Sequence, residues 1–450
     1  MAAALLAGVA AGAHADRVDD YIARQMAINH VPGAAVAIVR DGKIVKMKGY
    51  GQANLEWRQP VTADTAFQLA SSTKPLTGML MMRLQEEGKL KLTDSLAKYI
   101  ADAPESWRAI TLRQLVDHSS GISDNIPGAG KTLDEFVAAA KDKPLAHVPG
   151  ASAEYGIAGY IVLSKVIEVA SGMPYTQALR HYVTGPLGMH ADFEHSTGSA
   201  DMRGFEVVPQ RAGIYEWTDT RYKNANFHYG PLSYDAGGLL ASATDLAKLS
   251  IALDGGKFLR RESVAEMWRP ERLGNGEVNG FGAGWVVREI NGRKTVGHSG
   301  GPALADILRY PDERMTFIVL TNGKSLYPYL AQGVSELYLP PVAAPMPQGI
   351  ADVMPQATAA MRKTIADGVA GRVDEELFSD EARKEFVPDY RTFLLPFLRS
   401  LPRLDELVLV SEKTTDDGLQ RRYRARHGKK DVTWQVDVDK EGKLLGFGPK

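Results

Sequence analysis

The sequence predicts an α+β protein whose antiparallel sheet is built from two distant parts of the chain. Residues 34–51 have the pattern of a hairpin, with an apolar strand, the turn pair Asp41-Gly42 and a returning strand. A second strand-rich region covers about 281–322 and contains another turn pair, Asn291-Gly292. The residues between them, from about 70 to 270, have a mostly helical pattern with loops. We therefore expect a helical insertion between the two halves of the sheet, with a cleft where the two parts meet.

Composition divides the 450 residues into four segments. Residues 1–15 are small and apolar and end in Ala13-His14-Ala15, a pattern typical of a signal-peptide cleavage site, although the usual basic start is missing. Residues 16–338 hold the predicted catalytic region, and 339–355 are proline-rich and have the pattern of a linker. Residues 356–450 predict a small α+β accessory domain, with one or two helices followed by three or four strands. The first segment predicts a periplasmic or secreted protein.

Composition and charge exclude several classes of function. Hydrophobic residues make up 44% of the chain and charged residues 24%, which is typical of a soluble globular protein. The net charge of −1 provides no field that would draw the protein to nucleic acid. Beyond residues 1–15, no stretch approaches the roughly 18 apolar residues that span a bilayer. The absence of cysteine excludes disulfides, thiolate metal sites and a cysteine nucleophile. Composition and charge therefore favour neither a nucleic-acid nor a membrane partner, and the sequence leaves the oligomeric state open.

A Ser-x-x-Lys motif, Ser71-Ser72-Thr73-Lys74, opens an apolar helical run. Residues three apart share a helix face, so Ser71 and Lys74 would form a nucleophile beside its base. Lysine is protonated near neutral pH, and burial or a nearby positive charge must favour the neutral form before it can accept a proton. Pro75 is tolerated only near a helix start, which places Ser71 there. The alternative is that Ser71 is only a helix cap and Lys74 a solvated lysine.

Two further segments carry groups that suit this chemistry. Tyr155 follows the turn Pro149-Gly150 and precedes a predicted helix, so it would lie in a loop from which it could transfer protons. Residues 298–301, His-Ser-Gly-Gly, follow a predicted strand, and the backbone N–H groups of such a small-residue edge can bind an oxyanion. Taken singly, Tyr155 would more often be a half-buried aromatic residue and 298–301 a turn.

In this order, the three elements resemble the serine β-lactamase/penicillin-binding-protein-like superfamily. Its pattern is Ser-x-x-Lys, then Tyr-x-Asn, then Lys-Thr-Gly or His-x-Gly. The flanking sequence is similar to the class C-like branch with the family VIII esterases and D-peptidases, at 67–75, 86–90, 110–115, 118–122, 186–189 and 297–301. The resemblance covers about residues 18–335. It implies a β-lactamase/transpeptidase-like fold and a serine hydrolase that needs no cofactor or metal.

The resemblance also implies roles for individual residues. Ser71 would be the acylated nucleophile, with Lys74 and Tyr155 as the proton-transfer pair. The N–H groups of Ser71 and Gly301 would form the oxyanion hole. His298 and Gly300 would line the substrate site.

The chain departs from the family pattern at two positions. Ile157 stands where the pattern has asparagine, and His298 stands where many members have lysine. Both changes weaken recognition of the amide and the carboxylate of a β-lactam. The sequence therefore favours hydrolysis of small esters or of D-amino-acid and peptide amides through an acyl-enzyme. The alternative is a β-lactamase, or a non-hydrolytic penicillin-binding or sensor module, which would acylate and stay acylated.

Residues 297–301 also satisfy Gly-x-Ser-x-Gly, the nucleophile elbow of α/β-hydrolases, with Ser299 as nucleophile. That motif needs a following helix and a downstream histidine. Here Pro302 and a further predicted strand pair follow, and the only later histidine is His427, beyond the linker. The sequence therefore disfavours this interpretation.

Two loops each permit two interpretations. His190, Asp192, Glu194 and His195 are possible metal ligands, but they lack the spacing that places two histidines on one helix face, so a surface loop is the simpler interpretation. Residues 224–234 are aromatic and polar, and the resemblance places them near the cleft. They would either shape acyl specificity or only pack the loop.

Overall fold

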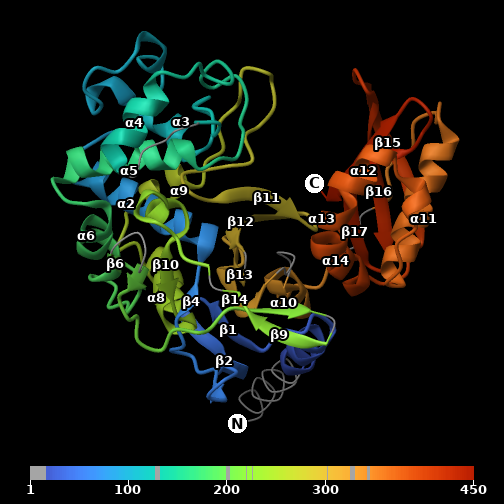
Figure 1. Ribbon diagram of the computed structural model, residues 1–450, viewed down its shortest axis with the longest axis horizontal. Coiled ribbons are helices and arrows are strands. Elements are labelled where there is room, and N and C mark those ends of the chain that lie inside the picture. The colour runs from blue at the N-terminus through green and yellow to red at the C-terminus, as the bar shows by residue number, and fades with distance from the viewer. Residues whose placement is uncertain are drawn as a thin grey trace.

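The computed structural model describes residues 17–126, 132–198, 203–218, 220–225, 227–301, 303–324, 330–341 and 345–449. The predicted signal peptide, residues 1–15, lies outside them. Figure 1 shows a larger body, with a sheet at one end and helices at the other, and a smaller body formed by the end of the chain. Within the described ranges, no helix has both the length and the apolar character needed to cross a membrane.

The larger body contains a nine-stranded sheet drawn from both ends of the catalytic region, as the sequence predicts. Its main path runs in the order β11-β12-β13-β14-β1-β2-β3. Strand β1 pairs antiparallel with β14, so the two distant regions meet in the middle of the sheet. The strands are β1 (Gly33–Arg40), β2 (Lys43–Asn54), β3 (Gln59–Pro60), β8 (Tyr215–Thr218), β9 (Arg221–Asn224), β11 (Val286–Ile290), β12 (Arg293–Gly300), β13 (Ala303–Tyr310) and β14 (Met315–Lys324).

Local sequence explains two hairpins of this sheet, β1–β2 and β11–β12. Asp41 and Gly42 have φ values of 49° and 70°, and Asn291 and Gly292 have 52° and 75°. Two consecutive residues with positive φ form a type I′ turn, whose twist suits a two-residue hairpin. Both predicted turns are therefore confirmed.

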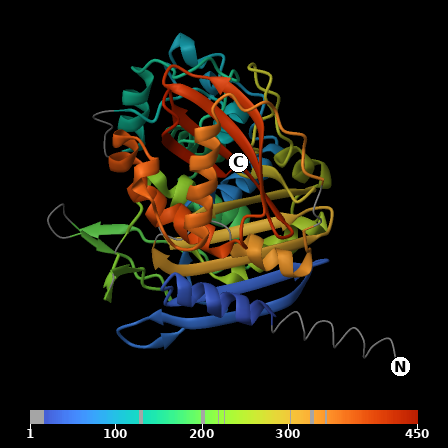
Figure 2. The same cartoon turned by 90° about the vertical axis from the view of Figure 1, so that its right-hand side faces the viewer.

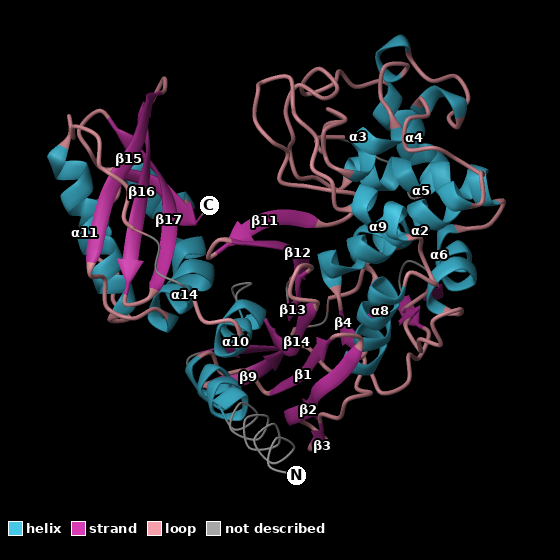
Figure 3. Cartoon of the chain, turned by 180° about the vertical axis from the view of Figure 1, so that it is seen from behind, coloured by secondary structure: helices cyan, strands magenta, loops and turns pink. Residues whose placement is uncertain are grey.

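Helices cover both faces of the sheet (Figures 1 and 3). Helix α8 packs on β1 and β14, and α10 packs on β13 and β14, so β1 and β14 are almost wholly buried. The helices of the larger body are one over 17–28, α2 (Lys74–Glu86), α3 (Leu112–Val116), α4 (Leu133–Lys141), α5 (Ala158–Ser171), α6 (Tyr175–Leu179), α7 (Tyr234–Gly237), α8 (Ala243–Gly255), α9 (Arg261–Met267) and α10 (Leu330–Tyr338). Short strands β4 (Phe67–Gln68), β10 (Leu239–Ala241) and β5 (Asp192–Phe193) form a small sheet, and β6 (Ser196–Gly198) pairs with β7 (Arg203–Phe205).

One large hydrophobic core joins the insertion to the sheet. It contains α2 and α5 residues together with sheet residues such as Ile307 and Ile318. Helix α2 is buried on nearly every side, including Met79, Leu80 and Leu84. Because α2 begins at the proposed Ser-x-x-Lys motif, the core holds that end of the helix rigidly against the sheet.

The smaller body, which Figure 2 places toward the viewer, has a separate core and a four-stranded antiparallel sheet. Its helical part differs from the predicted one or two helices, because Pro388 and Pro396 break the second stretch into short segments. The elements are α11 (Pro355–Val369), α12 (Asp380–Glu385), α13 (Val387–Asp389), a π-helical turn (Tyr390–Leu394) and α14 (Leu395–Ser400), followed by β15 (Glu406–Thr414), β16 (Gly418–His427), β17 (Lys430–Asp439) and β18 (Leu444–Pro449). Lys430 pairs with Glu336 of α10 at 2.5 Å, which links the two bodies.

Candidate active site

The structure places Ser71 in a 3-10 turn, η1 (Ala70–Thr73), that runs directly into α2. Pro75 occupies the first turn of α2, where its missing N–H costs no hydrogen bond. Ala70 has a φ of 47°, a left-handed conformation that costs a non-glycine residue on the order of 1–3 kcal/mol. The strained residue directly precedes the candidate nucleophile, and the surrounding core must hold it in place.

Lys74 is buried, with 1% of its surface exposed. Its Nζ lies 3.4 Å from Ser71 Oγ and donates a hydrogen bond of 2.8 Å to the carbonyl oxygen of Ala236 in α7. The rings of Tyr155 and Tyr160 flank the amine, with centroids 5.0 and 5.1 Å from Nζ. The alternative of a solvated lysine is therefore wrong, and Ser71 makes no helix-cap hydrogen bond.

His298 faces the same space from β12. Its ring centroid lies 6.0 Å from that of Tyr155, and Nδ1 lies 2.8 Å from the carbonyl oxygen of Ser299. Burial, together with the positive charge of Lys74, lowers the pKa of His298 to about 3. The imidazole is therefore neutral at physiological pH, with the proton on Nδ1 and an acceptor at Nε2 that has no partner among the described residues.

The end of β12 lies against the backbone of the nucleophile turn. A β-carbon on Gly300 would stand 2.0 Å from the carbonyl oxygen of Leu69 and 3.0 Å from Ser71 N, so only glycine fits. A β-carbon on Gly301 would meet nothing within 4 Å, so open space lies beside it. The structure thus brings the backbone of 300–301 next to that of Ser71, the arrangement that a two-donor oxyanion site requires.

A cavity of about 350 Å³ opens from these residues. Ser71, Tyr155 and His298 line it at one end. Arg288 and Asp306 also line it and bring a guanidinium and a carboxyl group to its wall. Three of the six predicted site residues therefore line a space that is large enough for a small molecule, while Lys74 and Gly300 lie beside Ser71.

Comparison with known proteins agrees with this geometry. The model of the Beta-lactamase family matches residues 18–333, which is more than two thirds of the chain. The chain belongs to this family. Membership places it in the serine β-lactamase and penicillin-binding-protein-like superfamily of serine hydrolases.

Several known proteins are similar to this chain. Protein flp of Staphylococcus aureus (strain MRSA252) is 26% identical over 330 residues, covering 69% of this chain but only 63% of its own length. The octameric penicillin-binding protein homologue from Pyrococcus abyssi aligns with a TM-score of 0.60 and 24% identity, over 94% of this chain and 96% of its own. EstCE1, described as a hydrolase with promiscuous acyltransferase activity, aligns with a TM-score of 0.58 and 22% identity, over 70% and 95%. Both structures share the fold with this chain.

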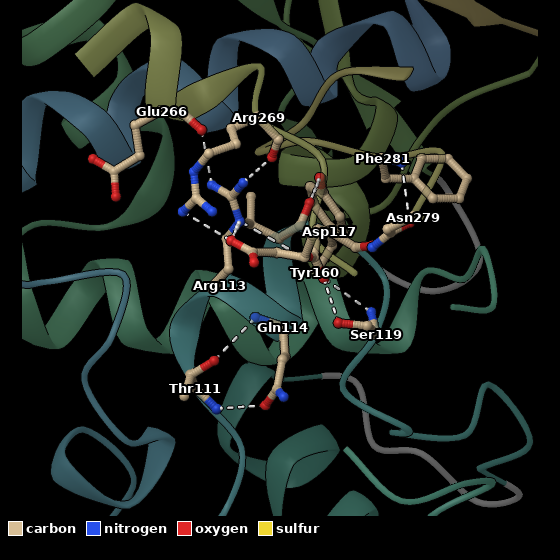
Figure 4. Close-up of polar contacts among 12 residues, drawn as sticks. Thr111, Arg113, Gln114, Asp117, Ser119, Tyr160, Glu266, Arg269, Asn279 and Phe281 are labelled. Carbon is tan, nitrogen blue, oxygen red and sulfur yellow. Dashed lines mark hydrogen bonds and ion pairs between the residues drawn. The ribbon is translucent and has the colours of Figure 1, made fainter. Parts of the chain in front are cut away.

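The family fold here includes contacts that sequence reasoning missed. Arg113 of α3 donates to the carbonyl oxygen of Glu266 at 3.0 Å and forms a 3.6 Å ion pair with Asp117 (Figure 4). Burial raises the pKa of Asp117 to about 6, and its carboxylate accepts a 2.6 Å hydrogen bond from Ser119 Oγ. Asn279 donates to the Asp117 carbonyl oxygen at 3.0 Å. The network fixes the loop that carries His118. This residue lies in 118–122, one of the segments that resemble the family, but its role could not be inferred from the sequence.

The nucleophile-elbow interpretation of Ser299 is wrong. Strand β12 is followed by β13, with no helix in the position that the motif needs. Ser299 Oγ donates a 2.8 Å hydrogen bond to Asp306, a buried carboxylate that also accepts from the N–H of Ala331. Among the described contacts, the Ser299 hydroxyl is bonded to this buried carboxylate and to no histidine, which the elbow motif requires.

The acidic and histidine-rich loop directs its side chains to separate partners. Asp192 pairs with Arg180 at 2.7 Å, and Glu194 pairs with Arg211 and, at 3.0 Å, with His228. Within the described part of the chain, no three such side chains converge in a geometry that suits a metal ion. The segment is also more than a surface loop, because Asp192 lies in β5 and Glu194 is buried.

The aromatic loop at 224–234 reaches the site. Tyr229 donates a 3.2 Å hydrogen bond to the carbonyl oxygen of Gly301. Gln68, just before η1, donates to the carbonyl oxygen of Phe227 at 2.9 Å and anchors the loop. Of the two interpretations that the sequence leaves open, these contacts favour a loop that borders the cleft.

Proposed function

We propose that the protein hydrolyses small esters through an acyl-enzyme on Ser71. Lys74 and Tyr155 move the proton of Ser71 Oγ to the departing alkoxide as the oxygen attacks the ester carbonyl. The N–H groups of Ser71 and Gly301 hold the oxyanion, and water then releases the acid and regenerates Ser71. The observation that carries this proposal is the buried amine of Lys74, 3.4 Å from Ser71 Oγ in an open cavity.

The preference for esters over β-lactams rests on two side chains. His298 is neutral, so it offers no positive charge to the carboxylate of a β-lactam. Ile157 has no amide to bind the acyl side of such a substrate. An ester with an apolar acyl group needs neither contact, and the aromatic loop that bonds Gly301 carries Phe227, an exposed aromatic side chain that suits such a group.

A second candidate substrate is a short peptide with a D-amino acid. Arg288 lines the cavity that opens from Ser71, and a guanidinium is the group best suited to bind a terminal carboxylate. A β-lactamase and a sensor that keeps its acyl group are the remaining candidates. Location in the periplasm or outside the cell stays a prediction from the composition of residues 1–15.

The test is steady-state hydrolysis of a short-chain p-nitrophenyl ester, with nitrocefin and a D-alanyl-D-alanine peptide beside it. We expect ester turnover in the wild type and its loss in Ser71→Ala. Ser299→Ala is the matched control and should keep most of the activity. An active Ser71→Ala, or an inactive but folded Ser299→Ala, would refute the assignment of the nucleophile.

Intact-protein mass spectrometry during turnover separates a hydrolase from a sensor. A hydrolase shows an acyl adduct on the protein that disappears when substrate is exhausted, whereas a sensor keeps the adduct. A preference for nitrocefin over the ester in kcat/KM would instead identify a β-lactamase. Hydrolysis of the peptide alone would support the D-peptidase interpretation.

A further inference from the structure

We propose that His118 and Asp124 are positioning residues that hold Tyr155 in place for proton transfer. This inference rests on the proposed function, in which Tyr155 moves a proton. Tyr155 lies in an irregular stretch between Pro149-Gly150 and α5, and its side chain is 44% exposed. Regular secondary structure does not fix the residue, so its geometry must come from contacts with other parts of the chain.

The backbone on both sides of Tyr155 is held by these two residues. The N–H of Glu154 donates to the carbonyl oxygen of His118 at 2.9 Å, and the N–H of Gly156 donates to His118 Nδ1 at 3.3 Å. Next along the chain, the N–H groups of residues 157 and 158 donate to Asp124 Oδ1 at 2.9 and 2.7 Å. Of the five backbone N–H groups from 154 to 158, four therefore donate hydrogen bonds to His118 or to the Asp124 carboxylate.

The side chain of Tyr155 is held as well. Its ring centroid lies 4.6 Å from that of His118 and 5.8 Å from that of Phe281. Phe281 in turn contacts the His118 ring at 4.8 Å. The phenol ring thus lies against the rings of His118 and Phe281, and Lys74 Nζ lies 5.0 Å from its centroid. Ring contacts of this kind favour one orientation of the aromatic side chain.

His118 is itself held in a conformation that suits this task. Its φ of 64° is in the left-handed region, which few non-glycine residues adopt without local support. The network of Arg113, Asp117 and Asn279 supplies that support directly before it in the chain (Figure 4). Burial and the charge of Lys74 lower the pKa of His118 well below its usual value, so Nδ1 stays free to accept from Gly156.

Asp124 supplies what the helix after Tyr155 lacks. The N-cap position of α5 is Ile157, which has no side-chain acceptor, whereas the family pattern has asparagine there. Asparagine is among the best N-cap residues. The Asp124 carboxylate, reaching from another loop, takes over the free N–H groups at this helix end. A β-carbon on Gly156 would lie 2.8 Å from Asp124 Oδ1, so a side chain at this position would push the carboxylate away from the helix end.

A double-mutant cycle between Asp124 and Tyr155 tests the proposal. Asp124→Ala, Tyr155→Phe and the double variant are compared by rapid-mixing measurement of ester acylation and by steady-state kcat and KM. A displaced catalytic group costs up to about 100-fold, so we expect Asp124→Ala to lower kcat by about tenfold, with KM within threefold. In the Tyr155→Phe background, Asp124→Ala should lower kcat less than twofold, because the hydroxyl group that Asp124 helps to position is absent.

Controls separate positioning from a loss of stability. Asp124→Asn keeps one oxygen acceptor and should recover most of kcat, and exposed Asn125→Ala, in the same loop, should behave as wild type. Melting temperatures show whether each variant is folded. His118→Asn provides a second variant in the same cycle, since asparagine tolerates a positive φ but removes the ring contact.

The outcomes distinguish this inference from the proposed function. If the kcat of Tyr155→Phe is within threefold of the wild-type value, Tyr155 takes no part in proton transfer and the proposed function is refuted at this step. If Tyr155→Phe is impaired but Asp124→Ala costs the same factor in both backgrounds, the mechanism stands and the positioning role is refuted. A rise in KM without a fall in kcat in Asp124→Ala would also refute it.

Discussion

Gly300 lies so close to Leu69 that a β-carbon on Gly300 would stand 2.0 Å from the Leu69 carbonyl oxygen. Real β-carbons do not approach a backbone oxygen to this distance, so the strand and the nucleophile turn would have to separate. The neighbouring Gly301 has open space around it. The tight contact therefore belongs to Gly300, and it sets the distance between the two backbone segments from which the proposed oxyanion donors come.

We expect Gly300→Ala to lower kcat by about 100-fold or more, because displacement of the oxyanion donors by about 1 Å is enough for such a loss. Gly301→Ala is the matched control, since the added methyl group meets no atom, and it should stay folded and keep its N–H in place. Ester hydrolysis and thermal melting of both variants provide the measurement. Equal activity of the two variants would show that the close approach does not matter for catalysis.

The hydroxyl of Tyr229 has a role at the same end of the site. It donates to the carbonyl oxygen of Gly301 at 3.2 Å, and burial raises the pKa of Tyr229 to about 12, so the hydroxyl keeps its proton. We expect Tyr229→Phe to lower kcat/KM about three- to tenfold, the scale of one hydrogen bond. The matched control is Tyr222→Phe in β9, which should act as wild type. An unchanged kcat/KM in Tyr229→Phe would show that the aromatic loop has only a packing role.

Short-range sequence signals predicted the architecture well. The two turn pairs Asp41-Gly42 and Asn291-Gly292 depend only on the backbone preferences of adjacent residues, so they could be predicted without a structure. Ser71 and Lys74 are one helical turn apart, and their spacing alone predicted the contact between their side chains. The broken helical stretch at 380–400 was less predictable, because each proline was compatible with either a helix start or a kink.

Contacts between distant residues account for what the sequence did not reveal. Asp124 precedes Ile157 by 33 residues, and nothing local marks Asp124 as the acceptor for that helix end. His118 is likewise 38 residues from Gly156. The sequence could show that Ile157 leaves α5 without a capping side chain, but only the tertiary fold shows which carboxylate replaces it. The buried environment of His298 also follows from packing around β12 and not from its motif.

The buried state of His298 predicts how stability depends on pH. Its pKa is about 3 in the folded protein, against 6.5 for an ordinary histidine. Between these values the unfolded chain binds a proton that the folded protein excludes, so stability falls as the pH is lowered from 6.5 towards 3. At pH 5 the loss relative to pH 7 amounts to about 2 kcal/mol, since one pKa unit corresponds to about 1.4 kcal/mol.

Other buried groups act in the opposite direction, so the comparison needs a variant. Burial raises the pKa of Asp117 to about 6 and of Asp235 to about 7, and protonation of these carboxyls stabilises the folded state as the pH falls through those values. His298→Asn removes only the histidine contribution. We therefore expect urea unfolding of the wild type to lose about 2 kcal/mol more than His298→Asn between pH 7 and pH 5. His190→Asn, at an exposed position, should follow the wild type. Parallel losses in wild type and His298→Asn would mean that His298 is accessible to protons in the folded protein.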